Sequence, residues 1–172
     1  MELLPEEYTR FYIVQALFKL MGQYQYEKIS VTDVVNKAGV GRATFYRYFK
    51  RKEDVIIYYF EHGKKAFNSE RHYYPRCKED YVKTAENVFK FFKDNLEQFK
   101  LIRKARLEYL YLDYLNKNFA ESFQNDGREG DDYLPCLYAG MLFNVSIRWL
   151  DRDCKEKEEE LAKTVVNAVY FN

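Results

Sequence analysis

The residues best suited to chemistry lie between Asp33 and Glu53, a window that contains no acidic side chain. The basic residues within it are Lys37, Arg42, Arg47, Lys50, Arg51 and Lys52. The hydroxyl groups of Thr44, Tyr46 and Tyr48 are interleaved with them. The whole chain has a formal net charge of only +1, so this positive charge is local. A local set of cations and hydroxyl donors predicts an anion-binding surface.

No comparable set of residues suggests catalysis or metal binding. The chain has two histidines and three widely spaced cysteines, Cys77, Cys136 and Cys154, without a CxxC pair or a Cys/His cluster. It has no GxSxG, P-loop or GxGxxG motif. We therefore expect no enzyme, no metal and no cofactor. No apolar stretch is long enough to span a membrane, so we expect a cytoplasmic protein with reduced thiols.

Helices must position the basic window, because turn-forming residues are scarce. The 172 residues include only 7 Gly and 3 Pro, whereas sheets joined by tight turns need many. Apolar residues recur at helical spacing along most of the chain. We expect an all-α fold of about nine helices, near residues 5–24, 31–38, 41–49, 52–68, 80–95, 96–104, 106–123, 133–151 and 158–170. The segments 69–78 and 125–131 are expected to connect them.

The second and third expected helices are joined by a very short turn. Ser30 can cap the second helix, and Asp33, three residues later, completes a capping box. Gly39 is expected to end this helix in the left-handed conformation. In the third helix, Phe45 and Phe49 are four residues apart and face inward. Two short helices joined by a tight turn that contains Gly predict a helix-turn-helix unit.

The third helix also carries a family motif. Residues 38–49 read Ala-Gly-Val-Gly-Arg-Ala-Thr-Phe-Tyr-Arg-Tyr-Phe, and Lys52-Glu53 follow. From Thr9 to about Val55 the sequence resembles, without gaps, the DNA-binding domain of the TetR/AcrR family. Gly41 and Ala43 stand where the family prefers Ser or Thr and Gly, and Gly is an acceptable helix cap. The resemblance implies a helix-turn-helix domain at 1–51 and a larger helical domain at 52–172.

The resemblance places the third helix in the major groove of duplex DNA. Arg42 is expected to read a base, because Arg can bond guanine through two hydrogen bonds. Ala43 would let the backbone approach or touch a thymine methyl group. The other residues expected at phosphates or base edges are Ser30, Thr32, Gly41, Thr44, Tyr46, Arg47, Tyr48 and Lys52. A run of charges is more often a solvated face, but here the order of Thr, Tyr and Arg matches the family.

A second, shorter resemblance lies in the C-terminal part. The segments 138–140, 144–145, 149–150 and 160–162 are similar to a regulator subgroup that includes the dihydroxyacetone-kinase activator DhaS. A protein of this type could line a pocket for a small-molecule effector with aromatic side chains. The candidates are Phe91, Phe92, Tyr109, Tyr111, Tyr114, Met141 and Phe143. Aromatic residues at helical spacing also fit a plain core, and this alternative stays open.

The last two expected helices offer apolar ridges for dimerisation. The ridges consist of Leu137, Met141, Val145 and Trp149 on one helix and Leu161, Val165 and Val169 on the other. Gly140 would let a partner helix approach closely. Two such helices from each chain could form a four-helix bundle around a two-fold axis. The alternative is that these ridges close the core of a single chain.

Together these features predict a sequence-specific transcription regulator that binds double-stranded DNA as a homodimer. Repression is the commonest mode in the resembled family, with a palindromic operator and release by an effector. Two alternatives stay open: an activator or co-activator of the DhaS type, and a protein-interaction module without DNA binding. Salt-dependent binding to duplex DNA separates the regulators from the interaction module, because phosphate contacts release counterions.

Overall fold

The computed structural model describes residues 5–67, 75, 77–125 and 133–170. Within these ranges the chain forms α-helices and one short 3-10 helix but no strand, which confirms the all-α expectation. The helices are α1 (Pro5–Met21), η1 (Tyr26–Lys28), α2 (Val31–Ala38), α3 (Arg42–Tyr48), α4 (Lys52–Phe67), α5 (Lys78–Asp94), α6 (Leu96–Lys104), α7 (Tyr109–Asn125), α8 (Tyr133–Leu150) and α9 (Glu158–Val169). Most of the expected connectors at 69–78 and 125–131 lie outside the described residues.

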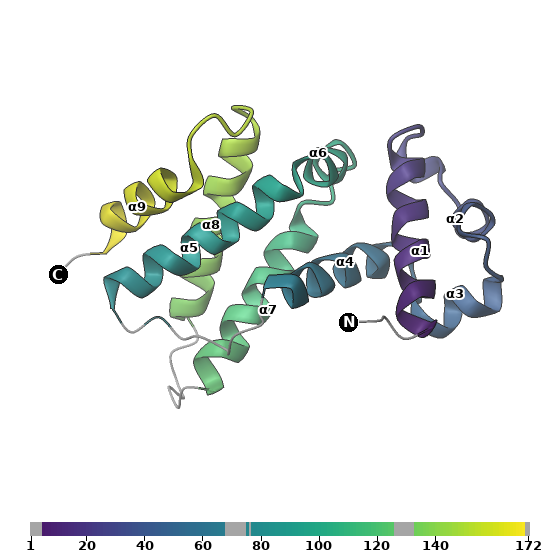
Figure 1. Cartoon of the computed structure of the whole chain (residues 1–172), viewed down its shortest axis with the longest axis horizontal. Coiled ribbons are helices and arrows are strands. Elements are labelled where there is room, and N and C mark those ends of the chain that lie inside the picture. The colour runs from purple at the N-terminus through teal and green to yellow at the C-terminus, as the bar shows by residue number, and fades with distance from the viewer. Residues whose placement is uncertain (1–4, 68–74, 76, 126–132, 171–172) are drawn as a thin grey trace.

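The molecule has two lobes. Helices α1, α2 and α3 form one end, α5, α7, α8 and α9 form the other, and α4 runs between them (Figure 1). Helix α4 packs on α1 and also on α5 and α7, so it contributes to both lobes. The domain boundary near residue 52 therefore stays a prediction.

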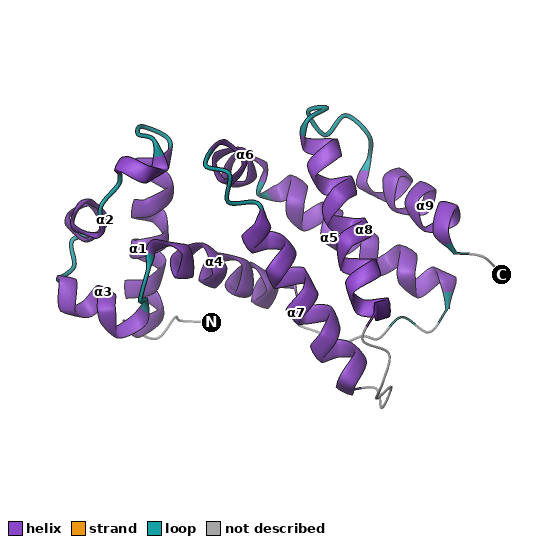
Figure 2. Cartoon of the chain, turned by 180° about the vertical axis from the view of Figure 1, so that it is seen from behind, coloured by secondary structure: helices purple, strands orange, loops and turns teal. Residues whose placement is uncertain are grey.

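The small lobe is built around the inner face of α1. Ile13 and Leu17 are fully buried and share a core with Val34 of α2 and Phe45 of α3. Only short loops separate these helices, as the view from behind shows (Figure 2). Phe11, which the periodicity placed on the inner face of α1, is instead 48% exposed. Apolar side chains surround most of α1, so spacing alone could not decide which of them face the core.

The ends of the first two helices follow from local backbone chemistry. Gly39 adopts φ 71°, and its N–H donates to the carbonyl groups of Val35 and Asn36, so α2 ends as expected. Helix α1 ends at Met21, three residues earlier than expected. Gln25 is extended, and the 3-10 helix η1 follows it. A three-residue helix has no apolar period, so the sequence did not reveal it.

The large lobe has a core of stacked aromatic rings. The rings of Phe92 and Phe99 are stacked with centroids 4.0 Å apart, and Tyr111 meets Phe99 edge-on at 4.8 Å. Phe60 of α4 lies 5.3 Å from Tyr111. Because α4 contributes this ring, the link to the small lobe is anchored in the aromatic core.

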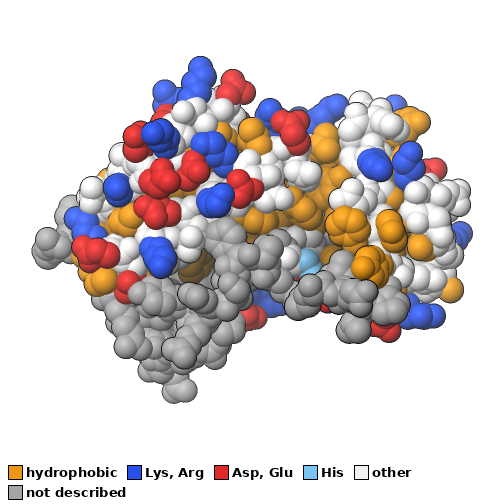
Figure 3. Space-filling view, in the orientation of Figure 1, with side chains coloured by type: hydrophobic (Ala, Val, Ile, Leu, Met, Phe, Trp, Pro, Cys, Tyr) orange, Lys and Arg blue, Asp and Glu red, His pale blue; other side chains and the backbone are white. Residues whose placement is uncertain are grey.

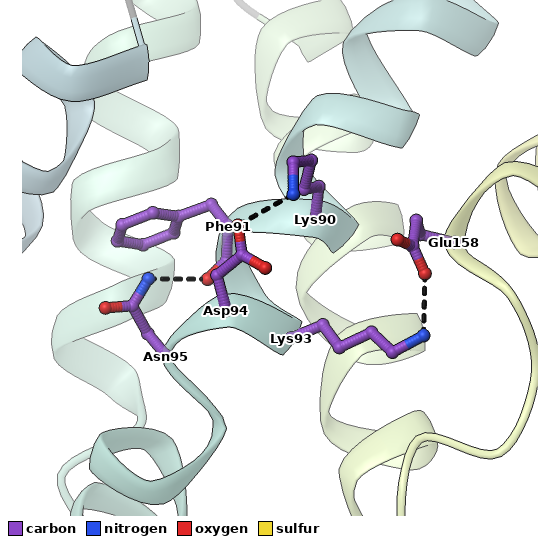
Figure 4. A network of polar contacts seen from close by, with 6 residues as sticks. All are labelled: Lys90, Phe91, Lys93, Asp94, Asn95 and Glu158. Atoms are coloured by element: carbon purple, nitrogen blue, oxygen red, sulfur yellow. Dashed lines mark hydrogen bonds and ion pairs between the residues drawn. The ribbon is translucent and has the colours of Figure 1, made fainter.

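Ion pairs and an amide fix the far end of α5. Lys93 Nζ donates to Glu158 Oε2 at 2.7 Å and thereby ties α5 to the first residue of α9 (Figure 4). This bond lowers the pKa of the Glu158 carboxyl group. Lys90 pairs with Asp94 at 2.9 Å, and the Asn95 amide donates to the carbonyl of Phe91 at 2.8 Å, where α5 ends.

Two tight turns contain residues with positive φ. Arg106 has φ 56° between α6 and α7, so α7 begins at Tyr109, three residues later than expected. Asp153 and Cys154 have φ 58° and 48° between α8 and α9. Cys154 is buried, and burial raises the pKa of its thiol to about 11. The thiols of Cys77 and Cys136 are exposed.

Candidate nucleic-acid interface

Helices α2 and α3 lie at the end of the molecule farthest from α8 and α9 (Figure 1). Hydrophobic side chains gather over α1 and the seam beside it, whereas acidic and basic side chains are mixed over α5 and α9 (Figure 3). On α2 and α3, the side chains of Lys37, Arg42 and Arg47 are exposed and have no carboxylate partner among the described residues. This end of the molecule therefore presents positive charge that no described ion pair neutralises.

The start of α2 is fixed by a complete capping box. The Asp33 N–H donates to Ser30 Oγ at 3.1 Å, and the Ser30 N–H donates to Asp33 Oδ2 at 2.8 Å. The Ser30 hydroxyl also donates to Asp33 Oδ2 at 2.6 Å, and these bonds lower the pKa of the Asp33 carboxyl group. In the DNA-free chain the Ser30 hydroxyl bonds within the box, and its expected phosphate contact stays a prediction. Thr32 is exposed and stays a candidate.

Helix α3 presents its polar side chains outward because its phenylalanines hold the opposite face. Phe45 is fully buried and Phe49 is 4% exposed, with their ring centroids 5.7 Å apart. The residues Arg42, Ala43, Tyr46 and Arg47 are exposed, whereas Thr44 and Tyr48 are half-buried. Gly41 caps the helix with φ −80°, a conformation open to any residue. A Cβ there would lie 3.8 Å from Thr44 Oγ1, so the Ser of the resembled family would fit.

A half-buried arginine lies beside Tyr48. The Arg10 guanidinium lies between two tyrosine rings, 5.0 Å from the Tyr48 centroid and 5.5 Å from that of Tyr58. Arg10 comes from α1, Tyr48 from α3 and Tyr58 from α4, so one cation links three helices. Sequence reasoning used Arg10 only as part of the family motif. Only the folded structure shows that Arg10 lies beside Tyr48, an expected DNA contact.

Lys52, which is expected at phosphate, makes hydrogen bonds within the protein to backbone groups that precede α2. Its ammonium donates to the carbonyl oxygens of Tyr26 at 2.9 Å and Ile29 at 2.5 Å. It also lies 4.1 Å from the centroid of the Tyr26 ring. Its ammonium is bonded to backbone oxygens in the DNA-free chain, and the expected phosphate contact of Lys52 stays a prediction. Burial among these groups lowers the pKa of Lys52.

The residues expected to line an effector pocket differ in burial. Phe92 and Tyr111 lie inside the packed aromatic core, and Tyr109 is 49% exposed. The half-buried residues of the set are Phe91, Tyr114, Met141 and Phe143. A cavity of about 240 Å³ lies elsewhere, between the lobes, where Met21 and residues 24–27 face Leu101, Lys104 and Ala105 of α6.

The residues expected at a dimer interface divide into three groups. Leu137 is 69% exposed and Val169 is 52% exposed. The half-buried members are Met141, Val145, Leu161 and Val165. Trp149 is a correction: it is only 2% exposed and packs edge-on against Phe89 of α5 within one chain. Helix α8 is apolar nearly all round, so a four-residue ridge could not show which flank faces outward.

The described residues also bear on metal binding and on membrane insertion. No group of three or more His, Cys, Asp or Glu side chains is placed to hold a metal ion in those ranges. No described helix combines the length and apolar character needed to cross a membrane.

A short turn between two small helices, with an outward-facing basic recognition helix, defines the helix-turn-helix class of proteins. Residues 13–59 match the family model described as bacterial regulatory proteins, tetR family. These residues are therefore similar to the tetR family of regulatory proteins. It is 31% identical over 96 residues to an HTH-type transcriptional regulator of Staphylococcus aureus strain USA300, with 56% of this chain and 50% of the relative aligned. The chain thus spans about half the length of the curated relatives that it matches.

Solved structures share the fold along nearly the whole chain. Lin0861 from Listeria innocua superposes with a TM-score of 0.81 at 19% identity, covering 98% of this chain and 93% of that one. The dihydroxyacetone kinase operon activator DhaS gives 0.59 at 20% identity, with 93% of each chain covered. FadR from Bacillus subtilis, solved with stearoyl-CoA, gives 0.51 at 20% identity, with 91% and 95% covered. These likenesses show a common two-lobed helical fold.

Proposed function

We propose that this chain is a sequence-specific DNA-binding transcription regulator. The outer face of α3 carries the proposal, because Arg42 and Arg47 are exposed there without a carboxylate partner among the described residues. Phe45 and Phe49 hold that face outward by filling the core behind it. A short helix with Arg near its N-terminus is suited to the major groove, where Arg recognises the acceptor pair of guanine.

The side chains of α2 and α3 have different roles on the duplex. Arg42, the first residue of α3, reads a base, and Ala43 beside it lets the helix approach closely. The hydroxyl groups of Thr32, Thr44 and Tyr46 bind phosphate oxygens. Arg47, one turn further along α3, binds either phosphate or a base edge. Phosphate contacts fix the register of the protein on DNA, and base contacts provide the specificity.

The regulator acts as a homodimer through α8 and α9. Leu137 and Val169 are large apolar side chains exposed on these two helices. Apart from the neighbouring backbone of α8 itself, no described atom lies within 4 Å of a Cβ built on Gly140, so a partner helix has room to approach there. A two-fold dimer places two α3 helices at successive major grooves of a palindromic operator, roughly 34–36 Å apart.

Repression relieved by a small molecule is the mode that we propose. The half-buried side chains Phe91, Tyr114, Met141 and Phe143 border the aromatic core of the large lobe, and an effector would enter there. Stearoyl-CoA occupies the Bacillus subtilis FadR structure, which shares this fold. Helix α4 joins that core to the small lobe, so a ligand that displaced α4 would alter the spacing of the two α3 helices.

The decisive experiment is selection of bound duplexes from a random library. A palindromic consensus would support both the operator and the dimer, whereas recovery of no consensus sequence would contradict sequence-specific binding. Affinity for the consensus should fall with salt, with a slope of log K against log salt of about −0.9 per neutralised phosphate. Transcription from the protein's own promoter should rise in a deletion strain if the protein is a repressor and fall if it is an activator.

A further inference from the structure

Three residues join the start of α4 to the segment that precedes α2. Lys52, the first residue of α4, donates its ammonium protons to the carbonyl groups of Tyr26 and Ile29 at 2.9 and 2.5 Å. Glu53, the second, accepts the Tyr26 hydroxyl proton at 2.8 Å. Tyr26 is therefore held at its backbone and at its phenol oxygen by two successive residues of another helix.

The surroundings show that these bonds are built into the small lobe. Tyr26 is only 7% exposed, and Lys52 and Glu53 are half-buried. The Lys52 ammonium lies 4.1 Å from the Tyr26 ring centroid, within the range of a cation–π contact. Burial and the Glu53 bond raise the pKa of the Tyr26 phenol, so it remains a donor at neutral pH. Hydrogen bonds from a charged group are among the strongest in proteins.

Because of its position in the chain, this contact can influence the placement of the helices proposed to bind DNA. Ile29 immediately precedes Ser30, the cap of α2. Helix α4 begins after the short turn that follows α3. The bonds therefore join the entry and the exit of the helix-turn-helix unit. Helix α4 continues into the aromatic core of the large lobe through Phe60. The same contact thus fixes α2 and α3 relative to the large lobe.

We propose that Tyr26, Lys52 and Glu53 form a positioning clamp that holds α2 and α3 on α4 in the orientation that binds DNA, with Lys52 acting inside the protein and not on phosphate. The proposal rests on the DNA-binding function proposed above. It assigns no DNA contact to any of the three residues. Each acts through the placement of α3, so its loss should lower affinity without removing a counterion-releasing contact.

The salt dependence of operator binding tests this role of Lys52 directly. Lys52→Met should weaken binding about tenfold, since a charged group loses its hydrogen bonds, while the slope of log K against log salt stays unchanged. A phosphate contact would instead reduce the slope by about 0.9. Lys50→Met is the matched control, because Lys50 is exposed and loses the same charge two residues away. A reduced slope for Lys52→Met alone overturns the proposal.

Conservative substitutions test the other half of the clamp. Glu53→Gln keeps a side-chain oxygen that can accept the Tyr26 hydroxyl proton and should bind nearly as wild type. Glu53→Ala and Tyr26→Phe should each weaken binding several-fold. The double variant Tyr26→Phe/Lys52→Met should cost less than the two single losses multiplied together, because both disable one unit. Independent effects of the two substitutions would contradict a clamp.

Hydrogen exchange without DNA separates failure of the clamp from failure of the proposed function. In Lys52→Met, the amides of α2 and α3 should exchange faster than in wild type, while those of α5 and α8 should be unchanged. Unchanged exchange in α2 and α3 overturns the clamp, whatever the protein binds. If wild-type protein binds no duplex but the exchange result appears, the DNA-binding function fails and the clamp stands as a structural element.

Discussion

The two lobes use their aromatic residues in opposite ways. In the large lobe, Phe92, Phe99 and Tyr111 are buried and pack against one another. In the small lobe, Tyr46 is 50% exposed beside Arg42 and Arg47, which have no carboxylate partner among the described residues. The small lobe builds its candidate site from one continuous stretch of sequence. The large lobe assembles its core from four helices, so no short motif marks its function.

The largest expected effect concerns the core behind the recognition helix. Phe45→Ala should lower the free energy of unfolding by about 3–5 kcal/mol, because a fully buried ring leaves a cavity in a small core. Thermal unfolding followed by circular dichroism measures the loss. Phe11→Ala is the matched control: Phe11 is 48% exposed, so its removal should change stability much less. Equal melting of the two variants would show that α3 does not depend on this core.

The next effect concerns the proposed dimer, which would make the large lobe an assembly surface. Leu137→Arg should weaken self-association at least ~100-fold, because the same charge would face its copy across a two-fold axis. Light scattering should show the wild type at about twice 20.9 kDa and the variant near 20.9 kDa. Asn87→Arg adds the same charge to an exposed position on α5 and should leave the dimer intact. A wild type that remains at the mass of one chain would contradict the dimer.

A smaller effect tests base reading by the small lobe. Arg42→Ala should cost about 1–3 kcal/mol of operator affinity and relax the preference at one base position. Competition binding with operators altered at single positions measures both quantities. Lys83→Ala removes an exposed cation from α5, outside the proposed DNA and dimer surfaces, and should change neither. If Arg42→Ala weakened operator and random duplexes equally, Arg42 would be a phosphate contact.

Removing the cap of α2 should have a modest effect on stability. Ser30→Ala should cost about 1 kcal/mol, because the N–H of Asp33 loses its acceptor at the start of α2. Chemical denaturation gives the value. Thr32→Ala, two residues along and exposed, serves as the control and should have little effect. A loss in Ser30→Ala no larger than in Thr32→Ala would show that the box does not stabilise the helix.

The smallest effect is a pH dependence of the same cap. Hydrogen bonds from Ser30 lower the pKa of the Asp33 carboxyl group below its ordinary value of 3.8. The carboxylate therefore stabilises the fold fully above that value, and the contribution is lost as the pH falls through the lowered pKa. The difference in melting temperature between wild type and Asp33→Asn should be constant near neutral pH and shrink below about pH 4. A constant difference down to pH 2 would contradict this assignment.

Local chemistry made much of the small lobe predictable. The capping box at Ser30, the left-handed Gly39 and the buried pair Phe45 and Phe49 all depend on residues a few positions apart. The helix-turn-helix unit and the exposed face of α3 follow from them. The internal bonds of Lys52 could not be predicted, because its partners, Tyr26 and Ile29, lie more than 20 residues away on a segment without apolar periodicity.

Long-range packing explains what was missed in the large lobe. Trp149 and Leu137 occupy the same expected ridge of α8, yet one is buried and the other exposed. Helix α8 carries apolar side chains on several flanks, and only its packing on α5 and α7 decides which of them are covered. Tyr109 falls outside the aromatic core because α7 begins only after the left-handed turn at Arg106. The turn contains no Gly, so its left-handed conformation could not be predicted from the sequence.

The turn between α8 and α9 contains a cysteine whose reactivity can report local opening of that turn. At neutral pH the buried Cys154 thiol, with its raised pKa of about 11, is neither accessible nor ionised, so it cannot react with an alkylating reagent while the turn is closed. Cys77 and Cys136 are exposed and react from the closed state. We therefore expect Cys154 to be alkylated slowly, at a rate set by openings of the turn that joins the two proposed dimer helices. If the chain dimerises through α8 and α9, alkylation of Cys154 should become slower as the dimer becomes tighter.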